Sequence, residues 1–430
     1  MTAKTAQNAG AQESTKTKIL RFLTKNSMTI ALVVVFILFY FLTDGRLLYA
    51  QNMSNLLLQN GYVLVMACGM LLCILTGGNI DLSVGSVICL TGGLAAVLIS
   101  NYGWNAYLTI LLCLCIGLAV GIWQGYWIGY VRIPPFITTL AGMFIFRGIG
   151  RLVLDSKTVA LAGENGARLS SLFNSFITIP GLDGSMVTEV NKKGVEVSKW
   201  VYLNIETPFG VIKALSPLIV GVAVVILLMV LTTVNRAGKA KRGYAQNSAL
   251  VDYGKTGIIG VVVLWYSFLL SQYKGISVML IWVLAICLIY NFITSKTVLG
   301  RYFYAVGGNE KATRLSGINT NKVYFLAYAN MGLLAGLCGL LCLARVGSVS
   351  GQTGTSFEMD AIGSCFIGGA SAYGGSGTVG GVVIGALLLG VINMGMSIMG
   401  ITDSWQYVVK GCVLLVAVIF DVVSSRKSGK

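Results

Sequence analysis

The chain has 430 residues, of which 56% are hydrophobic and 11% are charged. Soluble domains average about 45–50% apolar and about 25% charged residues, so this composition excludes a water-soluble globule as well as a disordered chain. Lys and Arg outnumber Asp and Glu by 31 to 15, a net charge of +16. In a polytopic membrane protein such an excess indicates which loops face the cytoplasm, rather than binding of nucleic acid. Histidine is absent, which excludes a histidine base, histidine metal ligands and a histidine proton relay.

Twelve segments are candidates for membrane spans, each of which needs about 20 mostly apolar residues. The polar, basic residues 1–27 come first and predict a cytoplasmic tail before an uncleaved first span. Eleven strongly apolar segments follow in chain order: 28–43, 54–76, 84–100, 106–127, 136–153, 215–233, 257–271, 276–294, 323–344, 378–399 and 405–424. The twelfth segment, 357–371, is short and rich in glycine. Its sequence leaves open whether it crosses the membrane or forms a re-entrant loop.

The distribution of charge orients these segments, because cytoplasmic loops carry the excess of Lys and Arg. Basic residues concentrate at 234–255, at 295–322 and in the tail 426–430, whereas acidic residues balance basic ones in the long loop 155–214. We therefore expect both termini and the loop 295–322 on the cytoplasmic side and the loop 155–214 outside. Eleven crossings would leave the basic C-terminal tail outside, so this arrangement requires the twelfth segment to cross as well. The transmembrane domain then covers residues 28–425.

Two stretches of the chain resemble each other. Segments 61–93 and 328–369 each hold an apolar helix rich in small residues, an acidic break, a Gly-Ser pair and a short apolar run that ends in Gly-Gly. Seven crossings separate the predicted helices, so the copies would be inverted in the membrane. Transporters are commonly built from inverted repeats with broken helices. The expected fold is therefore all-α, a polytopic helix bundle with a loose inverted repeat and broken helices.

A second motif lies in the cytoplasmic loop at 299–318 (LGRYFYAVGGNEKATRLSGI). Asn309 follows a Gly-Gly turn and can cap a helix, Glu310 and Arg314 are four residues apart on one helical face, and Gly317 can end the helix. The pattern fits either a solvated loop or a short helix that docks on a cytoplasmic partner. The residues that carry the docking hypothesis are Gly307, Gly308, Asn309, Glu310, Arg314 and Gly317.

Polar side chains within the apolar segments are candidates for a translocation path, because ionisable residues at membrane depth are costly and commonly functional. The break at 76–86 (TGGNIDLSVGS) carries Asp81, for which a capped turn is the alternative. Arg147 lies deep enough to need an acid or a backbone carbonyl as partner, and amides within spans also serve as bonds between helices. The candidates are Asp81, Ser83, Gln124, Arg147, Glu358, Asp360 and Asn393.

No residue pattern indicates catalysis or a metal site. The ten cysteines lie in apolar stretches without a CxxC pair, as buried small hydrophobic residues do. Segment 249–256 (ALVDYGKT) fits a permissive phosphate-loop pattern, but it opens a predicted span and has Ala in place of the first Gly. We therefore expect a transport subunit rather than an enzyme, without a cofactor and without its own nucleotide site.

Five blocks of the sequence resemble the permease subunits of bacterial ABC sugar importers of the ribose/xylose type, above all the xylose and multiple-monosaccharide permeases. The blocks are 77–86 (GGNIDLSVGS), 134–149 (PPFITTLAGMFIFRGI), 300–318 (GRYFYAVGGNEKATRLSGI), 357–369 (FEMDAIGSCFIGG) and 405–411 (WQYVVKG). The resemblance implies a permease homodimer that lies in the bacterial inner membrane and contacts its lipid. It also implies that the pair of spans at 215–271 is a hairpin added to a ten-span core and that 181–200 is an insertion.

The same resemblance implies two further partners and a mechanism. A separate cytoplasmic ATP-binding subunit would hydrolyse the ATP and dock on 305–317, and a periplasmic sugar-binding protein would deliver a monosaccharide such as xylose. Transport would proceed by alternating access. The main rival is an ion-coupled secondary transporter, for which Asp81, Glu358 and Asp360 are the available intramembrane acids. A membrane-embedded enzyme and a channel are the other rivals.

Overall fold

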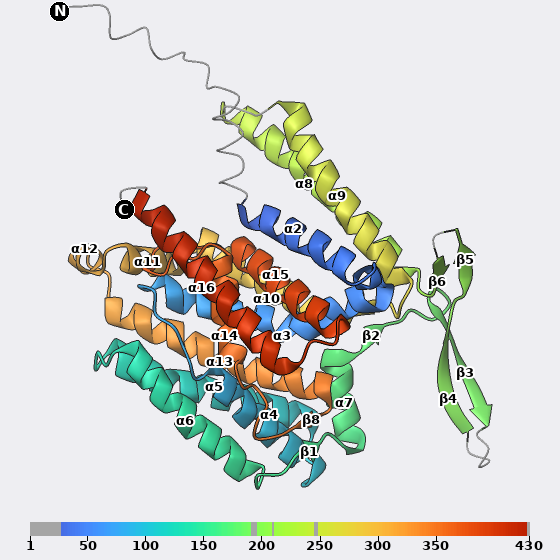
Figure 1. Cartoon of the computed structure of the whole chain (residues 1–430), viewed down its shortest axis with the longest axis horizontal. Coiled ribbons are helices and arrows are strands. Elements are labelled where there is room, and N and C mark those ends of the chain that lie inside the picture. The colour runs from blue at the N-terminus through green and yellow to red at the C-terminus, as the bar shows by residue number, and fades with distance from the viewer. Residues whose placement is uncertain (1–26, 191–195, 209, 245–247, 428–430) are drawn as a thin grey trace, which may run out of the picture.

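The computed structural model describes residues 27–190, 196–208, 210–244 and 248–427. These residues form a bundle of roughly antiparallel helices (Figure 1). In chain order the bundle helices are α2 (Ser27–Leu42), α3 (Ala50–Leu75), α4 (Val84–Ser100), α5 (Ala106–Gly129), α6 (Pro135–Val153), α8 (Ser216–Lys241), α9 (Ala249–Ser271), α10 (Val278–Lys296), α13 (Thr320–Val346), α14 (Phe357–Ile367), α15 (Val379–Ile398) and α16 (Asp403–Lys427). The shorter helical elements are η1 (Arg46–Leu48), α7 (Gly163–Asn174), α11 (Val298–Gly308) and α12 (Glu310–Leu315).

Each of the twelve predicted segments overlaps one of the bundle helices, several of which extend beyond the predicted bounds. Eight helices in the described part of the chain are long and apolar enough to cross a membrane, and α2 and α4 are apolar but shorter. Side chains of Asn105, Ser277 and Thr378 accept a backbone N–H at the starts of α5, α10 and α15, which fixes where these helices begin. The prediction of a polytopic helical membrane protein is confirmed.

The segment 357–371, which the sequence left open as a crossing or a re-entrant loop, contains only the 11-residue helix α14. A helix of that length spans about 16 Å, half the thickness of the hydrocarbon layer. The N-terminal tail was predicted over 1–27, but its residues 1–26 lie outside the described part, as do 428–430 of the C-terminal tail.

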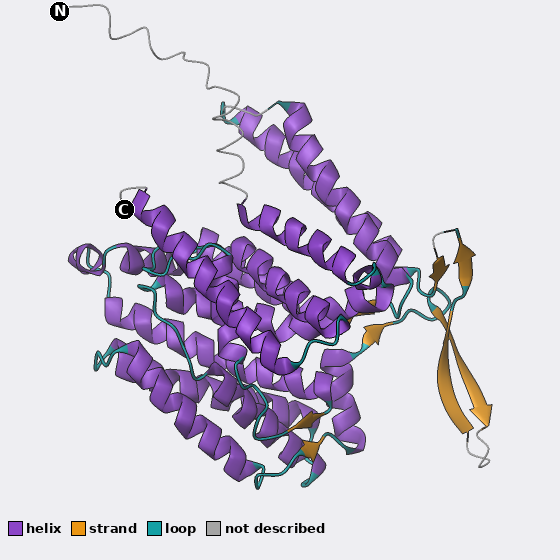
Figure 2. Cartoon of the chain, viewed as in Figure 1, coloured by secondary structure: helices purple, strands orange, loops and turns teal. Residues whose placement is uncertain are grey.

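The loop 155–214 contains structure that the sequence prediction lacked. Helix α7 lies against the bundle, and two hairpins project from the same end (Figure 2). The strands pair antiparallel as β1 (Val159–Ala160) with β8 (Ser348–Val349), β2 (Phe176–Ile177) with β7 (Ile276–Ser277), β3 (Gly184–Val190) with β4 (Glu196–Tyr202), and β5 (Ile205–Thr207) with β6 (Gly210–Ile212). The suspected insertion 181–200 therefore includes β3 and most of β4.

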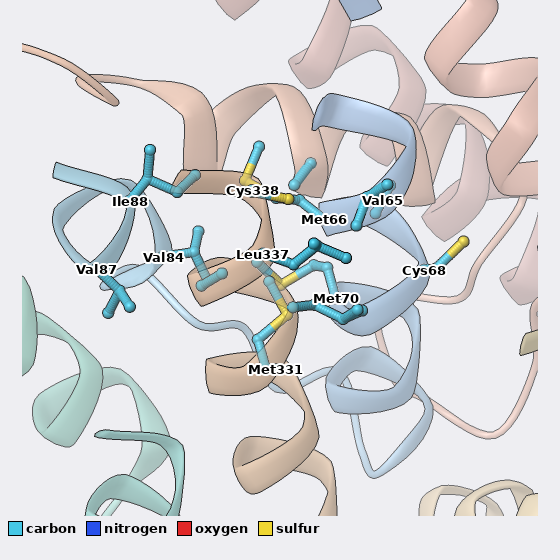
Figure 3. Close-up of a cluster of buried hydrophobic side chains, with 14 of the residues drawn as sticks. Val65, Met66, Cys68, Met70, Val84, Val87, Ile88, Met331, Leu337 and Cys338 are labelled. Atoms are coloured by element: carbon cyan, nitrogen blue, oxygen red, sulfur yellow. The ribbon is translucent and has the colours of Figure 1, made fainter. Parts of the chain in front are cut away.

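The core lies where α3, α4 and α13 meet (Figure 3). Figure 3 shows Met70 of α3, Val84 of α4 and Met331 of α13 converging there, and each of them is at least 99% buried. Helices α5 and α13 approach still more closely through glycine. A Cβ atom at Gly332 would lie 2.3 Å from the carbonyl oxygen of Gly117. Lipid tails are as apolar as these side chains, so close backbone packing between small residues stabilises such a bundle.

Gly332→Ala is expected to lower the thermal stability of the purified protein, because the added methyl group must push α5 and α13 apart. Overpacking of this kind typically costs about 1–3 kcal/mol. Gly254→Ala on α9 is the matched control, since a Cβ atom there would meet nothing within 4 Å. Thermal unfolding of both variants in one detergent measures the difference. Equal midpoints for the two variants would contradict the close α5–α13 contact.

Candidate functional site

Two helices begin inside the bundle instead of at its ends. Helix α4 follows the non-helical segment 76–83, and α14 follows the segment 347–356, in which Ser348–Val349 forms β8. The two starts touch, because a Cβ atom at Gly85 would lie 2.1 Å from the carbonyl oxygen of Gly354. Helix α4 packs against α13 and α14 packs against α3, so each short helix contacts the long helix of the other repeat copy. This crossed arrangement agrees with the predicted repeat and with its broken helices.

The segment that contains α14 passes from one end of the bundle to the other. At its start, Val349 pairs with Val159 of β1, at the end that carries α7 and the strands (Figure 1). Beyond α14, the amide of Gly375 donates to the carbonyl oxygen of Leu75, 3.0 Å away, at the end that carries α11 and α12. A short strand, turns and the half-length helix α14 therefore carry the chain through the bundle from one end to the other.

Three of the predicted path residues form one hydrogen-bonded chain at the first break. Oδ1 of Asp81 accepts hydrogen bonds from the amide and the hydroxyl of Ser83, at 2.9 and 2.7 Å. Nε2 of Gln124, on α5, donates to the same hydroxyl at 2.6 Å. All three residues are at least 99% buried. The carboxylate therefore closes a turn at Ser83, the residue before α4, inside the bundle.

Arg147 and Glu358 flank the second break. The Arg147 guanidinium, on α6, donates to the carbonyl oxygen of Thr353, so its partner is a backbone carbonyl, one of the two options that the sequence left open. The Glu358 carboxylate lies at the contact of the two breaks, where a Cβ atom at Gly85 would be 2.5 Å from its Oε2. Arg147 thereby ties the turns at 350–356 to α6.

Asp360 forms an ion pair that the sequence analysis missed. Nζ of Lys410, on α16, lies 2.9 Å from Oδ1 and 3.1 Å from Oδ2 of Asp360. The exposed fractions of the two side chains are 5% for Asp360 and 20% for Lys410. Lys410 belongs to the block WQYVVKG, which the sequence analysis had singled out. The sequence did not indicate that its partner is Asp360, 50 residues earlier. Asn393 lies on α15, and its buried Oδ1 accepts no hydrogen bond from the described residues.

The motif at 299–318 forms two short helices, α11 and α12. Oδ1 of Asn309 accepts from the amide of Ala312 at 2.9 Å and caps α12, as predicted. The chain turns after Leu315 with Gly317 at φ +82°, a left-handed conformation that glycine adopts without strain. Gly307 packs closely, because a Cβ atom there would lie 1.8 Å from the carbonyl oxygen of Leu75. A Cβ atom at Gly308 would meet nothing within 4 Å.

Glu310 binds groups outside its own helix. An oxygen of Glu310 lies 2.8 Å from the Arg132 guanidinium, and its carboxylate accepts hydrogen bonds from Thr320 and Tyr324, each at 3.1 Å. The Arg132 guanidinium also lies 5.0 Å from the centroid of the Tyr324 ring, within cation–π distance. These contacts hold α12 against the start of α13 and the α5–α6 connection.

Partial burial opposes ionisation of Glu310, but the hydrogen bond from Tyr324 and the contacts with Arg132 outweigh it. The pKa of the Glu310 carboxyl therefore lies below its ordinary value. Arg314 and Leu315 lie on the surface of α12, and the Leu315 side chain is 89% exposed. Glu310 thus anchors the start of α12, while an exposed cation and an exposed apolar side chain stand at its end.

Comparison with known proteins identifies the family. The family model described as "Branched-chain amino acid transport system / permease component" matches residues 52–271 and 255–418. The xylose transport system permease protein XylH of Escherichia coli K12 is 34% identical over 401 residues, which cover 93% of this chain and 92% of XylH. XylH of Haemophilus influenzae is 35% identical, with 93% and 96% covered.

A second group of relatives is somewhat more distant. The ribose import permease protein RbsC of E. coli K12 is 30% identical over 373 residues, which cover 86% of this chain and 85% of RbsC. No solved structure matches. The family model covers most of the chain and the sugar permeases match along nearly all of it, so the chain belongs to this family of transport permeases and is of the xylose/ribose type.

Proposed function

We propose that this chain is the membrane-spanning subunit of an ATP-binding-cassette importer that translocates a monosaccharide, xylose or a related aldose. The observation that carries the proposal is the similarity to XylH over 93% of the chain. The family description names branched-chain amino acids, so membership alone does not name the substrate. The named sugar permeases support a sugar.

The exposed side of α12 supports an ATPase as the partner. The interactions of Glu310 hold α12 rigidly against the bundle, so a force on its outer surface moves the start of α13 with it. Arg314 and Leu315 offer a cation and an apolar side chain to a docking surface. In this proposal the coupling segment faces the cytoplasm, as do both termini, and the end that carries α7 and the strands receives a periplasmic sugar-binding protein.

The mechanism is alternating access around the two breaks. ATP binding closes the partner ATPases, α12 follows, and the helix bundle rocks around the contact of α4 with α14. Hydroxyl, amide and carboxylate groups at the breaks exchange hydrogen bonds with sugar hydroxyls, which need no net charge along the path. The chain itself makes and breaks no covalent bond. Two permease copies in the inner-membrane lipid complete the importer in this proposal.

Uptake of labelled monosaccharides by a strain lacking this chain tests the function. We expect xylose or a related aldose to enter cells that carry the chain together with its ATPase and binding protein, and entry to fall to background without the chain. Branched-chain amino acids serve as the second substrate set, because the family description names them. Uptake of an amino acid and of no sugar would contradict the proposal.

A further inference from the structure

Two adjoining cavities lie between α14 and α16, around the ion pair of Asp360 and Lys410. Their volumes are about 210 Å³ and about 100 Å³, and four residues line both of them: Ser356, Asp360, Tyr407 and Lys410. Drug-sized ligands fill pockets of about 300–1,000 Å³. The two cavities together reach the lower end of that range, a size that suits a smaller ligand such as a monosaccharide.

The lining has the chemistry of a site for hydroxyl groups. In the smaller cavity, Asp360 supplies acceptor oxygens and Lys410 supplies donor hydrogens, so the pair can serve both the O–H and the lone pairs of neighbouring hydroxyls. Thr355 and Gln406 add further polar atoms to the same wall. Aromatic rings complete it, since Tyr62 of α3 stacks on Phe357 with ring centroids 4.3 Å apart. An apolar wall with a few convergent polar groups is typical of small-molecule sites.

Stability alone does not account for this ion pair. A buried ion pair contributes little compared with two well-packed apolar side chains, because both charges must lose their water. The cost is larger within a membrane span, where ionisable residues are commonly functional. The α14–α16 contact is otherwise apolar around the larger cavity, with Met359, Leu389 and Leu414 in its wall. Another apolar pair would hold these helices together equally well.

We propose that the cavities around Asp360 and Lys410 form a low-affinity subsite of this permease for the hydroxyl groups of an aldose. This inference rests on the proposed function and names its substrate contacts. In the empty subsite the carboxylate and the ammonium group satisfy each other. In the occupied subsite, two neighbouring hydroxyls of the sugar bridge them, and the C–H face of the ring lies against the Tyr62 and Tyr407 side chains. Sugar entry therefore loosens the direct link between α14 and α16.

Protection of an introduced thiol tests the subsite. Thr355 is exposed and lines the smaller cavity, so Thr355→Cys gives a reporter for a small, polar alkylating reagent. The complete transporter in lipid nanodiscs is labelled, with the parent chain as background for the native cysteines. We expect millimolar xylose to slow alkylation of the reporter several-fold. Betaine, an osmolyte without hydroxyl groups, should leave the rate unchanged.

Variants of the ion pair separate a sugar subsite from a purely structural pair. Asp360→Asn and Lys410→Met should each abolish protection, and so should the double variant, which leaves no unpaired charge and therefore keeps the assembly intact. Arg168→Gln is the matched control, because it removes the exposed pair of Arg168 with Glu164 on α7. It should retain full protection.

Protection that persists in the double variant would overturn the subsite, as would the absence of protection in a reporter that still transports sugar. Either result would leave the proposed function intact. Failure of the parent transporter to take up any sugar would instead contradict the proposed function, and the subsite with it.

Discussion

Gly354→Ala is expected to abolish transport, although it adds a single methyl group. Gly354 has φ +77°, a conformation that costs other L-residues roughly 1–2 kcal/mol. Its Cβ atom would also lie 2.2 Å from the carbonyl oxygen of Gly85, a backbone atom that cannot rotate away. The start of α4 must therefore separate from the segment before α14. Sugar uptake and the thermal midpoint of the purified chain measure the two consequences.

Gly347→Ala is the matched control for this prediction. Gly347 has nearly the same φ, +76°, but a Cβ atom there would meet nothing within 4 Å. The control therefore carries the backbone strain without the collision. We expect it to keep most of the uptake and to lose about 1–2 kcal/mol of stability. Equal loss of uptake in both variants would show that strain, and not the contact of the two breaks, matters at position 354.

Glu310→Gln is expected to reduce sugar-stimulated ATP hydrolysis in the assembled transporter about fivefold. The amide keeps the shape of the carboxylate but loses the charge that Arg132 contacts. Hydrogen bonds to charged groups contribute about 1.5–3 kcal/mol when buried, and the exposure of this pair reduces its share to about 1 kcal/mol. Helix α12 then moves without α13, so ATP hydrolysis loses its link to the sugar.

Lys311→Ala is the control for that variant, because Lys311 is the exposed neighbour of Glu310 on α12. Its removal should leave both the basal and the sugar-stimulated hydrolysis nearly unchanged. Arg314→Ala should instead weaken binding of the ATPase, since this side chain lies on the outer surface. If Glu310→Gln behaved as Lys311→Ala does, the anchoring role of Glu310 would be wrong.

The pH dependence of coupling follows from the same residue. The folded protein holds the pKa of Glu310 below its ordinary value, which is about 4.3 in an unfolded chain. Its stabilising contribution is therefore fully present above that unfolded value and is lost as the pH falls through the lower, folded value. Glu310 therefore keeps its charge between pH 6 and pH 8, and sugar-stimulated ATP hydrolysis should not change over this range because of it. A loss of coupling in the parent chain, but not in Glu310→Gln, on going from pH 8 to pH 6 would contradict this assignment.

Local patterns in the sequence were sufficient for much of the fold. Apolar length predicted the positions of the bundle helices, and Asn309 and Gly317 marked the ends of α12 because caps depend on neighbouring residues. Charge parity required a crossing near residue 360 although no full helix exists there. The structure has turns and the short α14 there, in a segment that runs through the bundle from end to end, an arrangement that apolar length alone cannot predict.

Partners far apart in the chain were beyond sequence reasoning. The spacing of Glu310 and Arg314 placed both on one helical face, but nothing in the sequence indicated that Arg132 approaches Glu310 from the α5–α6 connection. Lys410 pairs with Asp360 because α16 packs on α14, and neither residue signals that contact locally. The pairing of β3 with β4 was not predicted for a different reason, because neither apolar length nor charge balance indicates strands within a polar loop.

ATP-dependent uptake into proteoliposomes tests the central claim most directly. The purified chain is reconstituted with its ATPase, and labelled xylose is offered together with the binding protein. The account predicts uptake when ATP reaches the ATPase, and none when ATP, the ATPase or the chain is left out. Sugar accumulation by the chain alone, driven by a proton or sodium gradient, would contradict it and favour a secondary transporter.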